Sequence, residues 1–149
     1  MRAVAVIPAR MGSNRFPGKV ISLVDGEPLV VHVWRRLKTA RTLDAVYVAT
    51  ADDAVAEVIQ AAGGEVLRTV GEHRCGTDRV AEAVQDIDAD IIVNVQADCA
   101  RLEPSVVDQV VDRLKEPGCA VVTPVAPLTD VNDVERADCV KAVLGHEGR

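Results

Sequence analysis

Residues 3–19 read Ala3-Val4-Ala5-Val6-Ile7-Pro8-Ala9-Arg10-Met11-Gly12-Ser13-Asn14-Arg15-Phe16-Pro17-Gly18-Lys19. The apolar run at the start predicts a buried strand that ends at Pro8. The loop after it has two glycines and three cationic side chains, although the whole chain has a formal net charge of -6. Gly12 and Gly18 allow backbone N–H groups to converge on an anion, and α/β proteins hold phosphate in such loops. The stretch therefore predicts a phosphate-binding loop, with an ordinary solvated turn as the alternative.

The spacing in this loop differs from the two common nucleotide-binding fingerprints. Gly12 and Gly18 lie six positions apart, which does not fit G-x-G-x-x-G. Val20 follows Lys19 where a P-loop requires a hydroxyl. The loop is neither a dinucleotide-binding motif nor a P-loop.

Strand-like and helix-like segments alternate along the rest of the chain. Apolar runs predict strands at 45–49, 65–67, 91–95, 120–125 and 140–144. Helical spacing of apolar residues predicts helices over 29–40, 53–62, 77–84 and 104–114. Good capping residues precede the second and third of these helices, namely Asp52 or Asp53 and Thr77 or Asp78. The alternation indicates the α/β class, with a mostly parallel sheet and helices on both faces.

Two polar segments follow strands in this arrangement. Arg10 to Lys19 comes after the first strand, and Asp98 comes just after the strand at 91–95. Ligands of parallel sheets bind beyond the carboxyl ends of the strands. We therefore expect both segments to meet at one edge of the sheet.

The composition narrows the classes of function. At 149 residues the chain suits a single domain over 1–149 with a real core, built from aliphatic side chains because only three residues are aromatic. The acidic balance argues against broad nucleic-acid binding, and no apolar run is long enough to span a membrane. The cysteines are scattered singly, which argues against a zinc ribbon or a thioredoxin-type site and fits free thiols in the cytoplasm: Cys75, Cys99, Cys119 and Cys139.

Three ordered blocks resemble a known family. Ile7 to Lys19 fits I-P-A-R-x-G-S-x-R-x-P-G-K, His73 to Arg79 is similar to H-x-S-G-T-[DE]-R, and Asp90 to Asp98 is similar to I-V-N-V-Q-G-D. All three resemble the sugar-activating cytidylyltransferases, most of all those specific for 3-deoxy-manno-octulosonate (Kdo). The resemblance spans nearly all of the chain and follows the family's order.

The resemblance implies a Rossmann-like nucleotidyltransferase fold and the reaction of CTP with Kdo to give CMP-Kdo and pyrophosphate, for lipopolysaccharide precursor synthesis. It implies catalytic roles for Arg10, Lys19 and Asp98, with Asp98 holding Mg²⁺. For His73 we expect a structural hydrogen bond. The family also suggests a homodimer. The nucleotide-binding residues that it implies are Pro8, Ala9, Arg10, Gly12, Ser13, Arg15, Lys19, Gly76, Thr77 and Gln96.

The chain departs from the family pattern near the metal ligand. The family's Q-G-D-E-P-L is Gln96-Ala97-Asp98-Cys99-Ala100-Arg101 here, and Cys75 replaces the serine of the second block. The chain stops where the family continues into its sugar-binding and dimer-forming portion, which also holds a second metal-binding aspartate. We therefore expect a single nucleotide-binding domain that is incomplete at its C-terminus. The possible substitutes for the missing carboxylate are Asp130, Asp133 and Asp138, and no spacing argument selects one.

Two other functions remain open at this point. One is a cytidylyltransferase for another acidic sugar, such as a sialic acid. The other is a nucleotide-binding pseudoenzyme without turnover. Whether a second carboxylate completes the metal site distinguishes an active enzyme from the pseudoenzyme.

Overall fold

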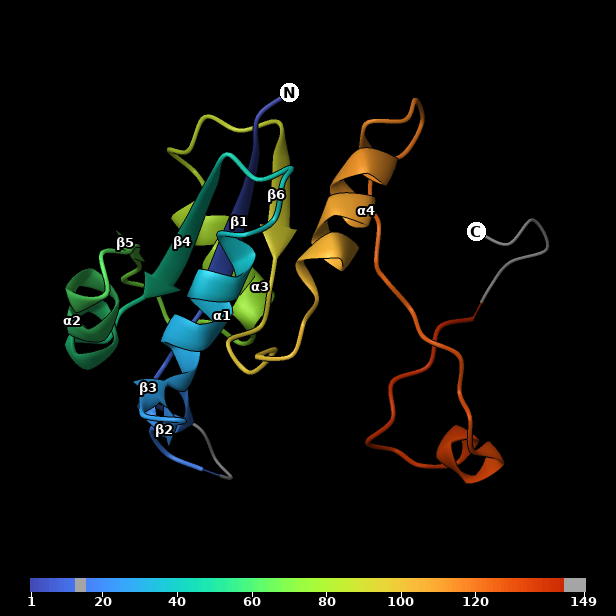
Figure 1. Cartoon of the computed structure of the whole chain (residues 1–149), viewed down its shortest axis with the longest axis horizontal. Helices are drawn as coiled ribbons and strands as arrows, with labels where there is room; N and C mark the ends of the chain where they lie inside the picture. The colour runs from blue at the N-terminus through green and yellow to red at the C-terminus, as the bar shows by residue number, and fades with distance from the viewer. Residues whose placement is uncertain (13–15, 144–149) are drawn as a thin grey trace.

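The computed structural model describes residues 1–12 and 16–143. Its centre is a parallel sheet in the order β5 (Glu65–Arg68), β4 (Ala45–Thr50), β1 (Ala3–Pro8) and β6 (Ile91–Asn94) (Figure 1). In the register Val6 lies opposite both Tyr47 and Asn94. The α/β class and the first four strands are therefore confirmed.

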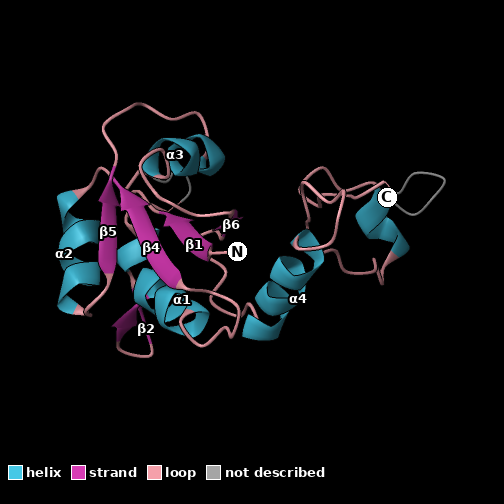
Figure 2. Ribbon diagram, turned by 90° about the horizontal axis from the view of Figure 1, so that it is seen from above, coloured by secondary structure: helices cyan, strands magenta, loops and turns pink. Residues whose placement is uncertain are grey.

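Helices cover both faces of this sheet. They are α1 (Leu29–Leu37), α2 (Asp53–Ala61), α3 (Gly76–Ala83) and α4 (Pro104–Leu114). Figure 2 shows α3 on one face of the sheet and α1 on the other. A small antiparallel hairpin, β2 (Leu23–Val24) and β3 (Glu27–Pro28), precedes α1, and short 3-10 turns lie at Lys19–Ile21 (η1) and Val131–Val134 (η2).

The core explains why β1 is apolar throughout. Successive strand residues point to opposite faces, so Ala5 and Ile7 enter one core cluster while Val4 and Val6 enter another. The first cluster packs the sheet against α1, α2 and α4, and the second packs it against α3. Because both faces are covered, the strand lacks the polar alternation of a half-exposed sheet.

The segment after α4 differs from the prediction. Residues 120–125 and 140–143 are not strands, and residue 144 lies outside the described part. Val121 and Val140 are 84% and 95% exposed, and the segment runs away from the sheet (Figure 1). An apolar run becomes a strand only when it pairs with the edge of a sheet and a layer covers it. Within the described residues no strand pairs with this segment.

Helix starts also differ in detail from the expected caps. Helix α3 begins at Gly76, with Cys75 rather than Thr77 or Asp78 at the N-cap, and Cys75 makes no capping hydrogen bond. Asp52 is at the N-cap of α2, but its side chain does not cap that helix. No helix within residues 1–12 and 16–143 is both long and apolar enough to cross a membrane.

Candidate functional site

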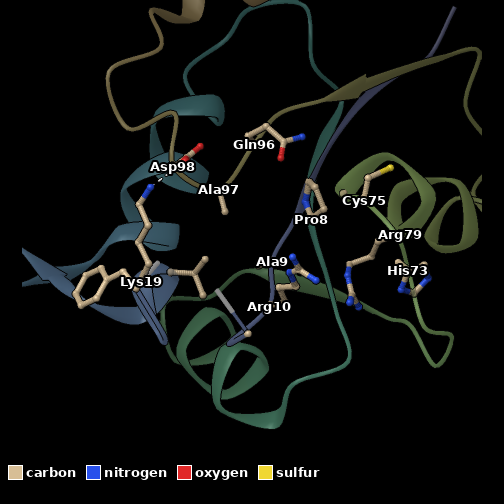
Figure 3. Close-up of a pocket in the computed structure, with 14 residues that line it drawn as sticks. Pro8, Ala9, Arg10, Lys19, His73, Cys75, Arg79, Gln96, Ala97 and Asp98 are labelled. Carbon is tan, nitrogen blue, oxygen red and sulfur yellow. Dashed lines mark hydrogen bonds and ion pairs between the residues drawn. The ribbon is translucent and has the colours of Figure 1, made fainter. Parts of the chain in front are cut away.

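A cleft of about 770 Å³ opens at the carboxyl edge of the sheet (Figure 3). The loops after β1 and β6 form it together with the N-terminal end of α3. The expectation that the polar segments meet at one edge is therefore confirmed. The lining residues are Pro8, Ala9, Arg10, Gly12, Phe16, Lys19, Val20, His73, Cys75, Gly76, Arg79, Gln96, Ala97 and Asp98.

The first loop is fixed by backbone hydrogen bonds and one carboxylate. Ala9 N–H donates to Ala49 O over 2.9 Å, and Gly18 N–H donates to Met11 O over 2.9 Å. Gly18 has φ +72°, which favours glycine. Asp52 Oδ2 accepts the Met11 N–H at 2.9 Å. The Met11 N–H is therefore already paired with a protein carboxylate and is not free to bind a phosphate.

Lys19 and Asp98 form an ion pair across the cleft. Lys19 Nζ lies 2.9 Å from Asp98 Oδ2, and the two side chains are 42% and 56% exposed. Arg10 also lines the cleft, is exposed, and has no ion pair with any residue in the described part of the chain. Figure 3 shows the Lys19–Asp98 pair on one side of the cleft and Arg10 between that pair and Arg79.

The opposite wall needs a glycine. A Cβ at Gly76 would lie 3.0 Å from Pro8 Cγ and 3.2 Å from Gln96 Oε1, which is closer than most real Cβ contacts. Gln96 Nε2 donates to Asn94 Oδ1 over 3.3 Å, and Asn94 Nδ2 donates to Thr77 Oγ1 over 3.1 Å. This chain of hydrogen bonds orients the Gln96 amide over the start of α3.

The segment before α3 is tied to that helix by Glu82. Its carboxylate accepts the N–H of Val70 at 2.7 Å and of Gly71 at 3.3 Å, and lies 2.6 Å from His73 Nε2. The backbone hydrogen bond from Val70 is the largest cause that lowers the pKa of Glu82. The expected structural hydrogen bond of His73 is thus present.

The sequence and the fold are similar to those of known proteins. The sequence profile of the cytidylyltransferases matches residues 4–149. The chain belongs to the cytidylyltransferase family.

Named relatives agree with this family. A 3-deoxy-manno-octulosonate cytidylyltransferase of Geobacter sulfurreducens is 40% identical over 149 residues, covering 99% of this chain and 60% of that protein. The protein of the same name in Geobacter metallireducens is 41% identical to this chain, and the match covers 99% of this chain and 59% of that protein. The chain thus spans about three fifths of their length.

A solved structure supports the fold. A CMP:2-keto-3-deoxy-manno-octonic acid synthetase in complex with CTP superimposes with a TM-score of 0.75 and 37% identity, over 77% of this chain and 48% of that one. The nucleotidyltransferase fold implied by the sequence is therefore confirmed for this chain.

The cleft brings together most of the site residues implied by the resemblance. Thr77 is absent from its lining, although its hydroxyl accepts a hydrogen bond from Asn94, while Ser13 and Arg15 lie outside the described residues. Sequence reasoning gave no ligand role to His73, Cys75 or Arg79, which also line the cleft. The burial of Arg79 was not visible in the pattern, because a charged residue in the first turns of a helix is usually solvated. The residues that are present in the lining are Pro8, Ala9, Arg10, Gly12, Lys19, Gly76, Gln96 and Asp98.

Asp98 could hold Mg²⁺ if the phosphates of a bound nucleotide supply the other ligands of the ion. No group of three or more His, Cys, Asp or Glu side chains suited to a metal occurs within residues 1–12 and 16–143. Magnesium commonly takes one or two carboxylates together with substrate phosphates. Burial, followed by the charge of Asp98, raises the pKa of the neighbouring Cys99 thiol. Cys99 therefore stays protonated beside Asp98 and adds no negative charge to the site.

The substitutes considered for a second carboxylate are engaged elsewhere. Asp130 accepts the N–H of Asn132 at the start of η2, and Asp133 and Asp138 pair with Arg136 at 3.1 and 2.8 Å. None of the three lines the cleft. Within the described residues, Asp98 is the one carboxylate of the cleft.

Proposed function

We propose that this chain binds CTP in the cleft and contributes the nucleotide-binding half of a Kdo cytidylyltransferase. The observation that supports this most is that three motif blocks, widely separated in sequence, line one cleft. The triphosphate would lie at the end with Arg10, Lys19 and Asp98. The cytosine would lie at the end with Gly76 and Gln96.

In the proposed reaction the anomeric hydroxyl of Kdo attacks the α-phosphate of CTP and pyrophosphate leaves. Arg10 and Lys19 offset the negative charge that builds up on the pyrophosphate. Asp98 would hold Mg²⁺, which spreads the charge of the phosphate oxygens when it is bound. The product would be a precursor for lipopolysaccharide, made in the cytoplasm, and we expect the complete enzyme to be a homodimer like the family. The named relatives act on Kdo by name, and no observation favours another acidic sugar.

The ion pair between Lys19 and Asp98 provides the first test. We expect Lys19→Ala to weaken CTP binding by roughly 1.5–3 kcal/mol, the value of one charge-assisted hydrogen bond, with the loss shrinking at high salt. The same change should alter the free energy of unfolding by less than about 1 kcal/mol, because the pair is exposed. Calorimetric titration with CTP and thermal unfolding measure the two effects. Equal CTP affinity in wild type and Lys19→Ala would remove the phosphate role of the loop.

A series of nucleotides tests the base end. We expect CTP to raise the melting temperature of the protein more than ATP or GTP, because the wall at Gly76 leaves little room beside Pro8 and Gln96. Thermal-shift measurements with CTP, UTP, ATP and GTP at equal concentration give the ranking. Equal shifts for all four nucleotides would reduce the cleft to a generic phosphate site.

A further inference from the structure

The His73 and Arg79 side chains are both buried in the cleft, and one atom of His73 has no hydrogen-bond partner among the described residues. The His73 side chain is 6% exposed, and its Nδ1 has no hydrogen-bond partner among the described residues. Arg79 is 8% exposed and donates to Thr69 Oγ1, with no ion pair to a carboxylate of the described chain. Both residues line the cleft (Figure 3). Buried polar groups without partners are rare in native proteins, and each requires a physical explanation.

Glu82 decides which nitrogen of the His73 ring holds the proton. The carboxylate is ionised at neutral pH, because the backbone hydrogen bond from Val70 and the bonds from His73 and Gly71 lower its pKa. An ionised carboxylate only accepts hydrogen bonds, so His73 Nε2, 2.6 Å away, must be the donor. In the neutral ring the unpartnered Nδ1 is then an acceptor with a free lone pair.

We propose that His73 Nδ1 accepts a hydrogen bond from the exocyclic amino group of cytosine, and that Glu82 is the positioning residue that keeps Nδ1 unprotonated. This inference rests on the proposed function, in which the cleft binds CTP. Uracil has a carbonyl oxygen where cytosine has the amino group, so two acceptors would face each other. His73 therefore separates CTP from UTP.

Arg79 completes the match to cytosine. The pairing edge of cytosine presents one amino donor beside two acceptors, a ring nitrogen and a carbonyl oxygen. His73 offers one acceptor, and the Arg79 guanidinium retains free N–H donors beyond the one used by Thr69. The Nδ1 atom is enclosed, so the proposed contact requires a local shift that uncovers Nδ1 when the base binds.

The test compares CTP with UTP in variants of this pair. Dissociation constants for both nucleotides are measured by calorimetry at about pH 8, where an imidazole in water is neutral. For wild type we expect CTP to bind about 5- to 150-fold more tightly than UTP, the range for one mismatched buried polar group. In Glu82→Gln, the new amide can donate to His73 Nε2, which moves the ring proton to Nδ1. We expect this variant to lose affinity for CTP and to gain affinity for UTP.

A second variant tests the acceptor role of His73 separately, and a spectroscopic signal reports which ring nitrogen holds the proton. His73→Gln retains a donor for Glu82 but removes the acceptor, so the CTP-to-UTP affinity ratio should fall to about one. Glu72→Gln is the matched control, because Glu72 is exposed on the same segment and the charge change is the same. Nitrogen-15 NMR of the imidazole reports the tautomer directly, with the proton on Nε2 in wild type and on Nδ1 in Glu82→Gln.

The outcomes separate this inference from the proposed function. A wild type that binds neither nucleotide overturns the proposed function. A wild type that binds CTP and UTP equally, or variants that weaken both nucleotides by the same factor, overturn the role of His73 and leave nucleotide binding intact. A wild-type spectrum with the proton on Nδ1 overturns the role of Glu82.

Discussion

At the scale of single residues, three carboxylates on or beside helices hold loops by accepting backbone hydrogen bonds. Asp52 accepts the Met11 N–H, Glu82 accepts those of Val70 and Gly71, and Asp108 accepts the N–H and hydroxyl of Thr42 at 2.8 Å each. Two of these loops form walls of the cleft. These short polar contacts therefore fix the positions of the loops that form the cleft.

These contacts predict acid sensitivity. The pKa of Glu82 is lowered from 4.5, mainly by the backbone hydrogen bond from Val70. For Asp108, burial works to raise the pKa, but hydrogen bonds from Thr42 and the charge of Arg41 outweigh it and the pKa is lowered from 3.8. A carboxyl whose folded-state pKa is lowered adds stability above its unfolded-state pKa, and this stability is lost as the pH falls through the folded-state value.

We therefore expect the free energy of unfolding to fall as the pH drops below 4.5, the unfolded-state value for Glu82. Denaturant unfolding at a series of pH values measures the slope. The free energy of unfolding should depend less steeply on pH in Glu82→Gln and Asp108→Asn than in wild type. It should depend on pH as in wild type in Glu72→Gln, whose side chain is exposed. A wild-type slope that both variants retain would contradict this assignment.

At the scale of elements, glycine placement decides how helix α2 passes into strand β5. Gly63 has φ +82° and ends the helix, and open space surrounds its missing Cβ. Gly64 serves a different purpose, because a Cβ there would lie 2.7 Å from Ile59 Cγ2 and 3.0 Å from Trp34 Cε2. Ile59 and Trp34 are both in the core, so neither can move aside freely.

We expect Gly64→Ala to lower the free energy of unfolding by about 1–3 kcal/mol, because overpacking a core forces side chains or backbone to shift. Thermal or denaturant unfolding measures the change. Gly12→Ala is the matched control for stability, since nothing lies within 4 Å of its Cβ position and its φ is ordinary. Equal stability of the two variants would show that Ile59 and Trp34 repack without cost.

At the scale of the whole molecule, the described residues form a cleft lined by one carboxylate, and the chain spans about three fifths of its relatives' length. Magnesium can arrive with the nucleotide phosphates, so binding needs less from the protein than catalysis does. An attacking hydroxyl misplaced by about 1 Å costs roughly a hundredfold in rate.

We therefore expect the 149-residue chain alone to bind CTP but to convert CTP and Kdo slowly or not at all. Pyrophosphate release with both substrates measures turnover, and Asp98→Asn is the control. Robust turnover by the wild-type chain that is abolished in Asp98→Asn would refute the prediction and show that this chain assembles a complete site.

The sequence by itself determined the sheet, most of the helices and the edge where the ligand cleft lies. These follow from local properties, since apolar strands, helical spacing and glycine-containing loops are visible in short windows around Val6, Val55 or Gly18. The resemblance in the three blocks added the family and eight residues that line the cleft.

Only the tertiary structure decided which groups are paired and which are not. The Met11 N–H donates to Asp52, which is 41 positions away in the sequence, and Lys19 pairs with Asp98, which is 79 positions away. The runs at 120–125 and 140–143 are strand-like in sequence but pair neither with the edge strand β6 nor with any other strand of the described residues. The unpartnered Nδ1 of His73 likewise depends on burial and on Glu82, and neither burial nor tautomer is a property of the local sequence.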